Sequence, residues 1–165
     1  TISLKEAFPK AEVVRTMPNF TALIGEGMTG VCYSNDISEI KKDKVNSFLQ
    51  SIGKTLVIEE KNIDALTGLS GSGPAFVFKF AEALSDAGVF CGLSRKDTYL
   101  LVAQTILGSA KMMLETDKHL GELKDSVTSP AGTTIEGIKA LEKNGFNNAV
   151  MEAVISSYKK SKELK

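Results

Sequence analysis

A hydroxyl-rich turn is the stretch of this sequence most suited to chemistry. Residues 123–135 place several Ser and Thr side chains, a proline and a glycine directly before an expected helix. The first N–H groups of a helix have no partner within it, so such a turn can bind a small anion, for example a carboxylate. An ordinary, well-capped connection between two helices explains the same residues equally well. Residues 70–73 (SGSG) form a second candidate of the same kind, because their glycines let a ligand or another backbone come close.

Three other patterns favour structural interpretations. Residues 25–30 (GEGMTG) match the dinucleotide fingerprint G-x-G-x-x-G, but they lack the strand before and the helix after that phosphate binding requires. We interpret them as a loop that enters a strand. Tyr158 and Lys162 have the Y-x-x-x-K spacing of one class of dehydrogenases, yet a packed Tyr and a solvated Lys explain the pair better. His119 is expected in a loop or at a helix start.

Composition excludes several classes of function. The 165 residues include 20 Lys and Arg against 20 Asp and Glu, so the formal net charge is zero and nucleic acid is not an expected partner. One His and two separated cysteines, Cys32 and Cys91, predict no metal site, no disulfide framework and no Ser/His/Asp catalysis. The sequence has no signal-peptide pattern and no apolar run of about 18 residues. We therefore expect a cytoplasmic protein without a membrane segment.

The first third of the chain has the pattern of an α/β sheet. Short apolar or β-branched runs predict strands over residues 12–17, 28–34 and 54–60, and Ser38 is the expected N-cap of a helix that ends at Gly53. Three strands with one covering helix leave a face of the sheet bare. The chain is therefore expected to begin inside a larger α/β domain.

The rest of the chain is expected to be helical. Two of the helices are apolar on all sides, which predicts that they are buried against a second subunit. Thr133 and Glu136 have the spacing of a capping box. The expected helices cover residues 63–69, 75–90, 97–115, 133–144 and 147–163.

Several separated motifs, in register from residue 12 onward, resemble those of the pyrroline-5-carboxylate reductase family. The main one spans residues 120–142, with VTSPAGTT at 127–134 as its core. Supporting matches are VRTMPN at 14–19, GEGMT at 25–29 and DALTGLSGSGPA at 64–75.

The resemblance implies both a fold and an activity. The fold class is mostly α, a helical dimerisation domain of the 6-phosphogluconate-dehydrogenase C-terminal-like type, preceded by the last strands of an α/β Rossmann domain. It places the Rossmann remnant at residues 1–60 and the dimerisation and substrate-binding domain at 61–165. Members of the family reduce 1-pyrroline-5-carboxylate to L-proline with NADPH or NADH, as homodimers that often build larger rings. The chain is then a truncated part of such an enzyme, with little or no activity of its own.

The resemblance also implies the site residues. It assigns the catalytic hydroxyl, near the imine nitrogen, to Thr134. It assigns substrate binding to Ser129, Gly132, Thr133 and Glu60. It assigns cofactor binding to Met17, Pro18, Asn19 and Ser126.

Two residues depart from the family pattern. Ala131 stands where the family usually has glycine, and Ser126 stands where some members carry Asn. Two alternatives remain: another imine or β-hydroxyacid reductase, and a purely structural helical dimerisation module. The β-hydroxyacid enzymes use a Lys in the helical domain for proton transfer, and residues 129–134 contain none.

Overall fold

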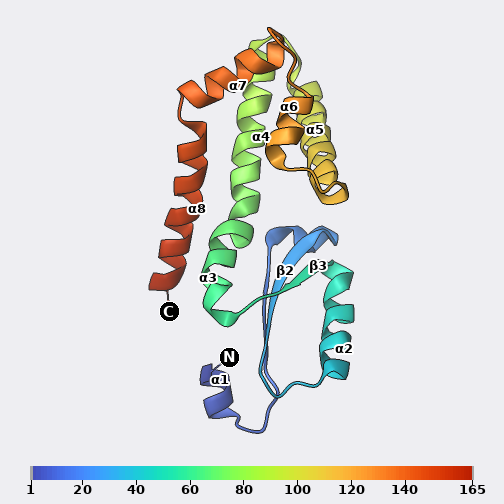
Figure 1. The fold of residues 1–165 in the computed structure, drawn as a ribbon, viewed down its shortest axis with the longest axis vertical. Helices are drawn as coiled ribbons and strands as arrows, with labels where there is room; N and C mark the ends of the chain where they lie inside the picture. The colour runs from blue at the N-terminus through green and yellow to red at the C-terminus, as the bar shows by residue number, and fades with distance from the viewer. Residues whose placement is uncertain (1, 165) are drawn as a thin grey trace. The chain divides into compact units, whose positions relative to one another are not determined.

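The structure, a computed structural model, describes residues 2–164 as a small sheet and a series of helices (Figure 1). Its elements, in chain order, are α1 (Ile2–Ala7), β1 (Val14–Pro18), η1 (Phe20–Ile24), β2 (Gly27–Tyr33), α2 (Glu39–Leu49), η2 (Gln50–Ile52), β3 (Gly53–Val57), η3 (Glu60–Asn62), α3 (Ile63–Leu66), η4 (Thr67–Gly71), α4 (Gly73–Phe90), α5 (Arg95–Glu115), α6 (Leu120–Ser126), α7 (Thr133–Lys143) and α8 (Phe146–Glu163).

The chain forms two compact units. The first comprises Thr1–Ala75 and Glu152–Lys165, and the second comprises Phe76–Met151. The first unit thus includes α3 and the carboxyl-terminal part of α8 together with the sheet. The expected domain ranges, 1–60 and 61–165, stay a prediction.

The first unit is built on a three-stranded sheet in the order β1-β2-β3. β1 and β2 are antiparallel, and β2 and β3 are parallel, with α2 as the crossover between them. Tyr33 on β2 donates a hydrogen bond to Asn46 Oδ1 of α2 at 2.8 Å, which ties that helix to the sheet. A Cβ on Gly30 would lie 2.4 Å from Leu66 Cδ2, so α3 packs directly on β2. The three predicted strands are present.

Gly68 lets α8 approach the segment that follows α3. Residues 67–71 form η4, a π-helical turn, in which the Ser72 N–H donates to the Thr67 carbonyl at 2.9 Å. A Cβ on Gly68 would lie 2.8 Å from Tyr158 N and 3.0 Å from Val154 O, which are backbone atoms of α8. Close by, Ser161 of α8 donates to the buried carboxylate of Asp64 at 2.9 Å. The last turns of α8 therefore hold η4 in place.

Gly68→Ala is expected to lower the free energy of unfolding by about 1–3 kcal/mol, because α8 must shift to admit the new methyl group. Urea unfolding monitored by circular dichroism measures this loss. Gly137→Ala is the matched control: a Cβ there meets nothing within 4 Å. Gly137 lies inside α7, so its replacement should stabilise the protein by about 0.5–1 kcal/mol. Equal stability of the Gly68→Ala variant and the unaltered protein would contradict the close packing.

The second unit contains α5, α6, α7 and most of α4. Ser94 caps α5 as expected, since its Oγ accepts the Asp97 N–H at 3.1 Å. Ser85 of α4 and Thr98 of α5 are buried, and their hydroxyl oxygens lie 2.7 Å apart. Large apolar side chains nevertheless remain exposed along this unit, among them Phe78, at 56%, and Leu100, at 72%.

Two local expectations differ from the structure. Residues 120–126 form α6, where a turn was expected from residue 123 onward. The segment is short and has Gly121 in its first turn, so it shows no clear helical periodicity. The N-cap of α7 is Gly132, so the capping-box interpretation of Thr133 and Glu136 is wrong. Gly132 leaves the first turn of α7 without a side-chain cap.

Candidate functional site

The hydroxyl-rich turn before α7 is a tight bend. Gly132 N–H donates to the Ser129 carbonyl at 3.1 Å, which closes a four-residue turn with Pro130 in its second position. Ala131, in the third position, has φ = 54°, the left-handed conformation that type II turns require there. Among residues 2–164, it is the only residue other than glycine with a positive φ. The backbone is therefore strained at this turn.

Ala131→Gly is expected to stabilise the protein by about 1 kcal/mol, because glycine adopts a positive φ without the steric cost of a Cβ. Thermal or urea unfolding measures the change. Ala140→Gly, in the interior of α7, is the control and should destabilise by about 1 kcal/mol. If both variants lose stability equally, Ala131 is not strained.

Polar groups converge on the start of α7. A Cβ on Gly132 would lie 2.2 Å from Ser129 Oγ, so only glycine leaves room for that hydroxyl. In the part of the chain that the structure describes, no hydrogen bond involves the hydroxyls of Ser129, Thr133 and Thr134. The uncapped N–H groups of the first turn of α7 lie beside them. This set can bind a carboxylate and still offer a hydroxyl to a second atom of the same ligand.

Ser126 differs from these residues. Its hydroxyl donates to the Leu123 carbonyl at 2.7 Å, at the end of α6. The oxygen still has lone pairs that can accept a hydrogen bond, but its proton is occupied.

A second group of predicted residues lies where β1 ends, in the first unit. Met17 and Pro18 are the last residues of β1, and Asn19 follows them. Asn19 Oδ1 accepts the Met28 N–H at 3.1 Å, and its Nδ2 donates a long hydrogen bond of 3.4 Å to Ser70 Oγ. This contact brings the candidate segment 70–73 to the end of β1. The sequence alone did not connect them.

Glycine at position 71 shapes the same place. A Cβ there would lie 3.3 Å from Met17 Cε, which is tighter than ordinary contact. The missing side chain therefore leaves the Met17 thioether beside a bare stretch of backbone.

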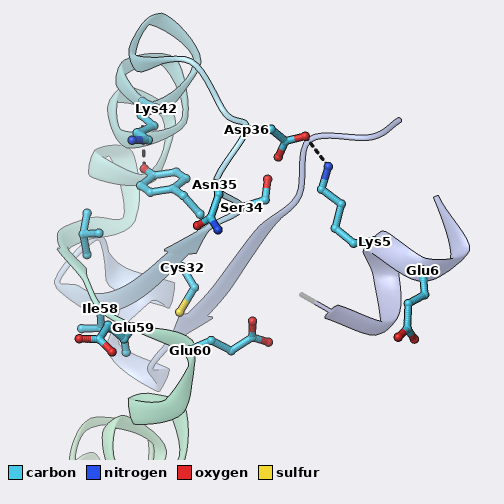
Figure 2. A pocket seen from close by; sticks show the side chains of 12 residues that line it. Lys5, Glu6, Cys32, Ser34, Asn35, Asp36, Lys42, Ile58, Glu59 and Glu60 are labelled. Carbon is cyan, nitrogen blue, oxygen red and sulfur yellow. Dashed lines mark hydrogen bonds and ion pairs between the residues drawn. The ribbon is translucent and has the colours of Figure 1, made fainter. Parts of the chain in front are cut away.

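Glu60 lies elsewhere, at the wall of a cavity of about 1120 Å³ (Figure 2). Its Oε1 forms an ion pair with Arg15 Nη1 at 3.0 Å. Cys32 also lines the cavity, and burial, together with the negative charge of Glu60, raises the pKa of its thiol. The thiol therefore stays protonated and is a poor nucleophile.

The opposite wall of this cavity carries a charged pair, Lys5 and Asp36 (Figure 2). Hydrogen bonds from Lys5 and Ser34 lower the pKa of the Asp36 carboxyl to about 2. Asp36 is thus a stable anion that is paired with Lys5.

The structure groups the predicted site residues within the two units. Ser126, Ser129, Gly132, Thr133 and Thr134 lie together in the second unit. The first unit contains Met17, Pro18 and Asn19 at one end of β1, and Glu60 after β3.

The remaining sequence motifs have structural roles. Gly25 ends η1 with φ = 77°, and Gly27 begins β2, as expected for a loop that enters a strand. His119 is the N-cap of α6 and accepts the Gly121 N–H at 3.0 Å, which agrees with its expected place at a helix start. Lys162 donates to Tyr158 Oη at 3.1 Å, and this bond raises the pKa of the lysine. Both residues lie on the last turns of α8, where a packing role suffices.

Residues 2–164 contain neither a metal-binding cluster nor a membrane-spanning helix. No three His, Cys, Asp or Glu side chains in this range are placed to bind one metal ion. No helix in it is both long and apolar enough to span a bilayer.

Residues 60–164 match the protein family described as "Pyrroline-5-carboxylate reductase dimerisation". Among curated relatives with the name pyrroline-5-carboxylate reductase, that of Synechocystis is 42% identical over 161 residues, which are 98% of this chain and 60% of the relative. The relative from Methanosarcina acetivorans is 47% identical over 152 residues, which are 92% of this chain and 56% of the relative. The chain thus spans about 60% of the length of these relatives.

Solved structures of pyrroline-5-carboxylate reductases are also similar to this chain. A pyrroline-5-carboxylate reductase of Coxiella burnetii superposes with a TM-score of 0.94 at 34% identity, over 100% of this chain and 62% of that one. The enzyme of Plasmodium falciparum, solved with NADP bound, has a TM-score of 0.88 at 42% identity, over 97% and 65%. The expected fold class, a helical dimerisation domain after strands of a Rossmann domain, is confirmed.

Proposed function

This chain belongs to the pyrroline-5-carboxylate reductase family, and we propose on that basis that it serves the reduction of 1-pyrroline-5-carboxylate to L-proline with NADPH or NADH. This is an oxidoreductase reaction, the last step of proline biosynthesis. One observation supports the proposal above the others: three hydroxyls without partners meet the uncapped start of α7. The substrate has a carboxylate and a ring nitrogen, which such a set can bind together.

Each residue of the turn has its own part in binding. The N–H groups of Thr133 and Thr134, with Ser129 Oγ, bind the substrate carboxylate. The N–H of Gly132 is occupied by the Ser129 carbonyl, so Gly132 acts through its missing Cβ, which leaves room for Ser129 Oγ.

Thr134 acts on the ring nitrogen. The carbon of a C=N bond accepts a hydride most readily when the nitrogen is protonated or bound by a hydrogen-bond donor. The Thr134 hydroxyl has no partner among residues 2–164 and can donate to that nitrogen. A placed hydroxyl is sufficient here, so the lack of a His-based acid–base pair agrees with this reaction.

The end of β1 fits a nicotinamide ring. The Met17 thioether, beside the bare backbone of Gly71, offers an apolar surface, and Asn19 offers polar atoms at its rim. When bound, NADPH or NADH supplies the hydride. Met17, Pro18 and Asn19 would hold the ring, and Ser126 Oγ would accept a hydrogen bond from the cofactor. Glu60 is proposed near the substrate with Arg15 as its partner.

We further infer a homodimer in the cytoplasm. The family is defined by dimerisation, and the exposed apolar side chains of α4 and α5 would be covered by a second copy. This arrangement also allows the larger rings that the family resemblance implies.

Titration of ¹⁵N-labelled chain with L-proline tests the substrate assignment. The N–H signals of Thr133 and Thr134 are expected to shift with saturation, whereas betaine, a carboxylate without a ring, should move them far less. If L-proline leaves both signals unchanged, the substrate assignment is wrong. Turnover is measured separately as NADPH oxidation with 1-pyrroline-5-carboxylate.

A further inference from the structure

Ser70 has a hydroxyl whose proton is without a partner. It lies in η4, is partly buried, and accepts the Asn19 Nδ2–H at 3.4 Å. Among residues 2–164, the Ser70 hydroxyl donates no hydrogen bond. A hydroxyl in this state can donate to a ligand.

Asn19 determines which way this hydroxyl can donate. Its Oδ1 accepts the Met28 N–H at 3.1 Å and lies 2.9 Å from Thr21 Oγ1. Because the Met28 N–H can only donate, it requires the amide oxygen of Asn19 on its side, and the amide turns its Nδ2 toward Ser70. The Nδ2–H of Asn19 then donates to a lone pair of Ser70 Oγ, and the hydroxyl proton of Ser70 must point away from Asn19.

The backbone around Ser70 is held firmly. The π-helical hydrogen bond from Ser72 N–H to Thr67 O spans the turn, and Gly68 packs on the backbone of α8. A binding residue on a rigid segment is already oriented before the ligand arrives, so little conformational entropy is lost on binding. Ser70 also follows Leu69 and precedes Gly71, the residue that leaves room for Met17.

We propose that Ser70 is a further cofactor-binding residue, whose hydroxyl donates a hydrogen bond to the carboxamide oxygen of the nicotinamide. Asn19 is the positioning residue that holds this hydroxyl in its donating orientation. The inference rests on the proposed function, because that function places the nicotinamide at residues 17–19. A carboxamide oxygen is a strong acceptor, and the 3.4 Å contact is of the long kind that tightens when a ligand is bound.

The test is a titration of the ¹⁵N-labelled chain with NADPH, followed by the signals of the Ser70 N–H and the Asn19 side-chain amide. Ser70→Ala is expected to raise the NADPH dissociation constant by about tenfold, the effect of one lost hydrogen bond. Asn19→Asp should have a similar effect, since the new carboxylate draws the Ser70 proton toward itself. The double variant should then lose less affinity than the sum of the two single losses, because both substitutions remove the same hydrogen bond to the cofactor. Ser47→Ala, on the exposed side of α2, is the control and should leave binding unchanged.

The possible outcomes separate this inference from the proposed function. If NADPH shifts the Met17 signals but Ser70→Ala binds it as tightly as the unaltered chain, the role of Ser70 is wrong and the proposed function stands. If L-proline, and not NADPH, shifts the Ser70 and Asn19 signals, the hydroxyl binds substrate and the cofactor assignment is overturned. If NADPH shifts no signal, the inference fails together with cofactor binding by this chain. Additive losses in the double variant would contradict the positioning role of Asn19.

Discussion

Replacing Thr134 by Ala in the full-length parent enzyme is expected to lower kcat/KM for 1-pyrroline-5-carboxylate by about 100-fold, the usual effect of removing one hydrogen-bond donor from a developing charge. The variant lacks the hydroxyl that would bind the ring nitrogen, while the N–H of residue 134, and with it the carboxylate site, is retained. Most of the loss should therefore appear in kcat. NADPH oxidation under initial-rate conditions measures both constants.

Two further variants complete this experiment. Thr134→Ser retains the hydroxyl and should recover most of the activity, whereas Ser156→Ala, on an exposed position of α8, should change nothing. Thermal unfolding of all three variants excludes loss of fold as the cause. If Thr134→Ala turns over at the rate of the unaltered enzyme, the helical unit is only a scaffold, as a purely structural dimerisation module would be.

Leu100→Asp is expected to weaken dimerisation by at least about 100-fold, because it places a charge where a second copy should cover an apolar side chain. Leu100 lies on α5 and is 72% exposed in the isolated chain, so the folded protomer does not depend on its burial. Sedimentation equilibrium over a range of concentrations measures the dissociation constant, and circular dichroism checks that the helices persist.

Ile40→Asp is the matched control for this substitution. Ile40 has nearly the same exposure, 71%, but lies on α2 in the first unit. The Ile40→Asp substitution should therefore leave the dimer intact. A well-folded monomer of the unaltered chain at micromolar concentration would contradict dimerisation through α4 and α5 altogether.

Local patterns predicted most of the secondary structure. The strand with Val14, the helix after Ser38 and the long helices from residue 75 onward follow from β-branched runs, caps and apolar periodicity. These signals act over a few residues, so one sequence is enough to find them. The same reasoning missed α6, whose seven residues contain too few apolar side chains to show a period.

The candidate site was predictable only in part. The turn before α7 was visible because Ser129, Gly132 and Thr134 are close in sequence, and the family resemblance gave them roles. The contact between Asn19 and Ser70 joins residues 51 positions apart, and no local rule predicts it. The role of Gly68 was equally hidden, because its partner atoms belong to the backbone of α8 and carry no mark in the side-chain sequence.

The hydrogen bond from Ser161 to Asp64 has a consequence for the order of folding. It joins residues 97 positions apart, within a unit that is assembled from two separate stretches of the chain. During translation, η4 has no helix to pack against until residues 152–163 have been made. The first unit can therefore complete its packing only after the residues of the second unit have been synthesised, and contacts of such long range form slowly.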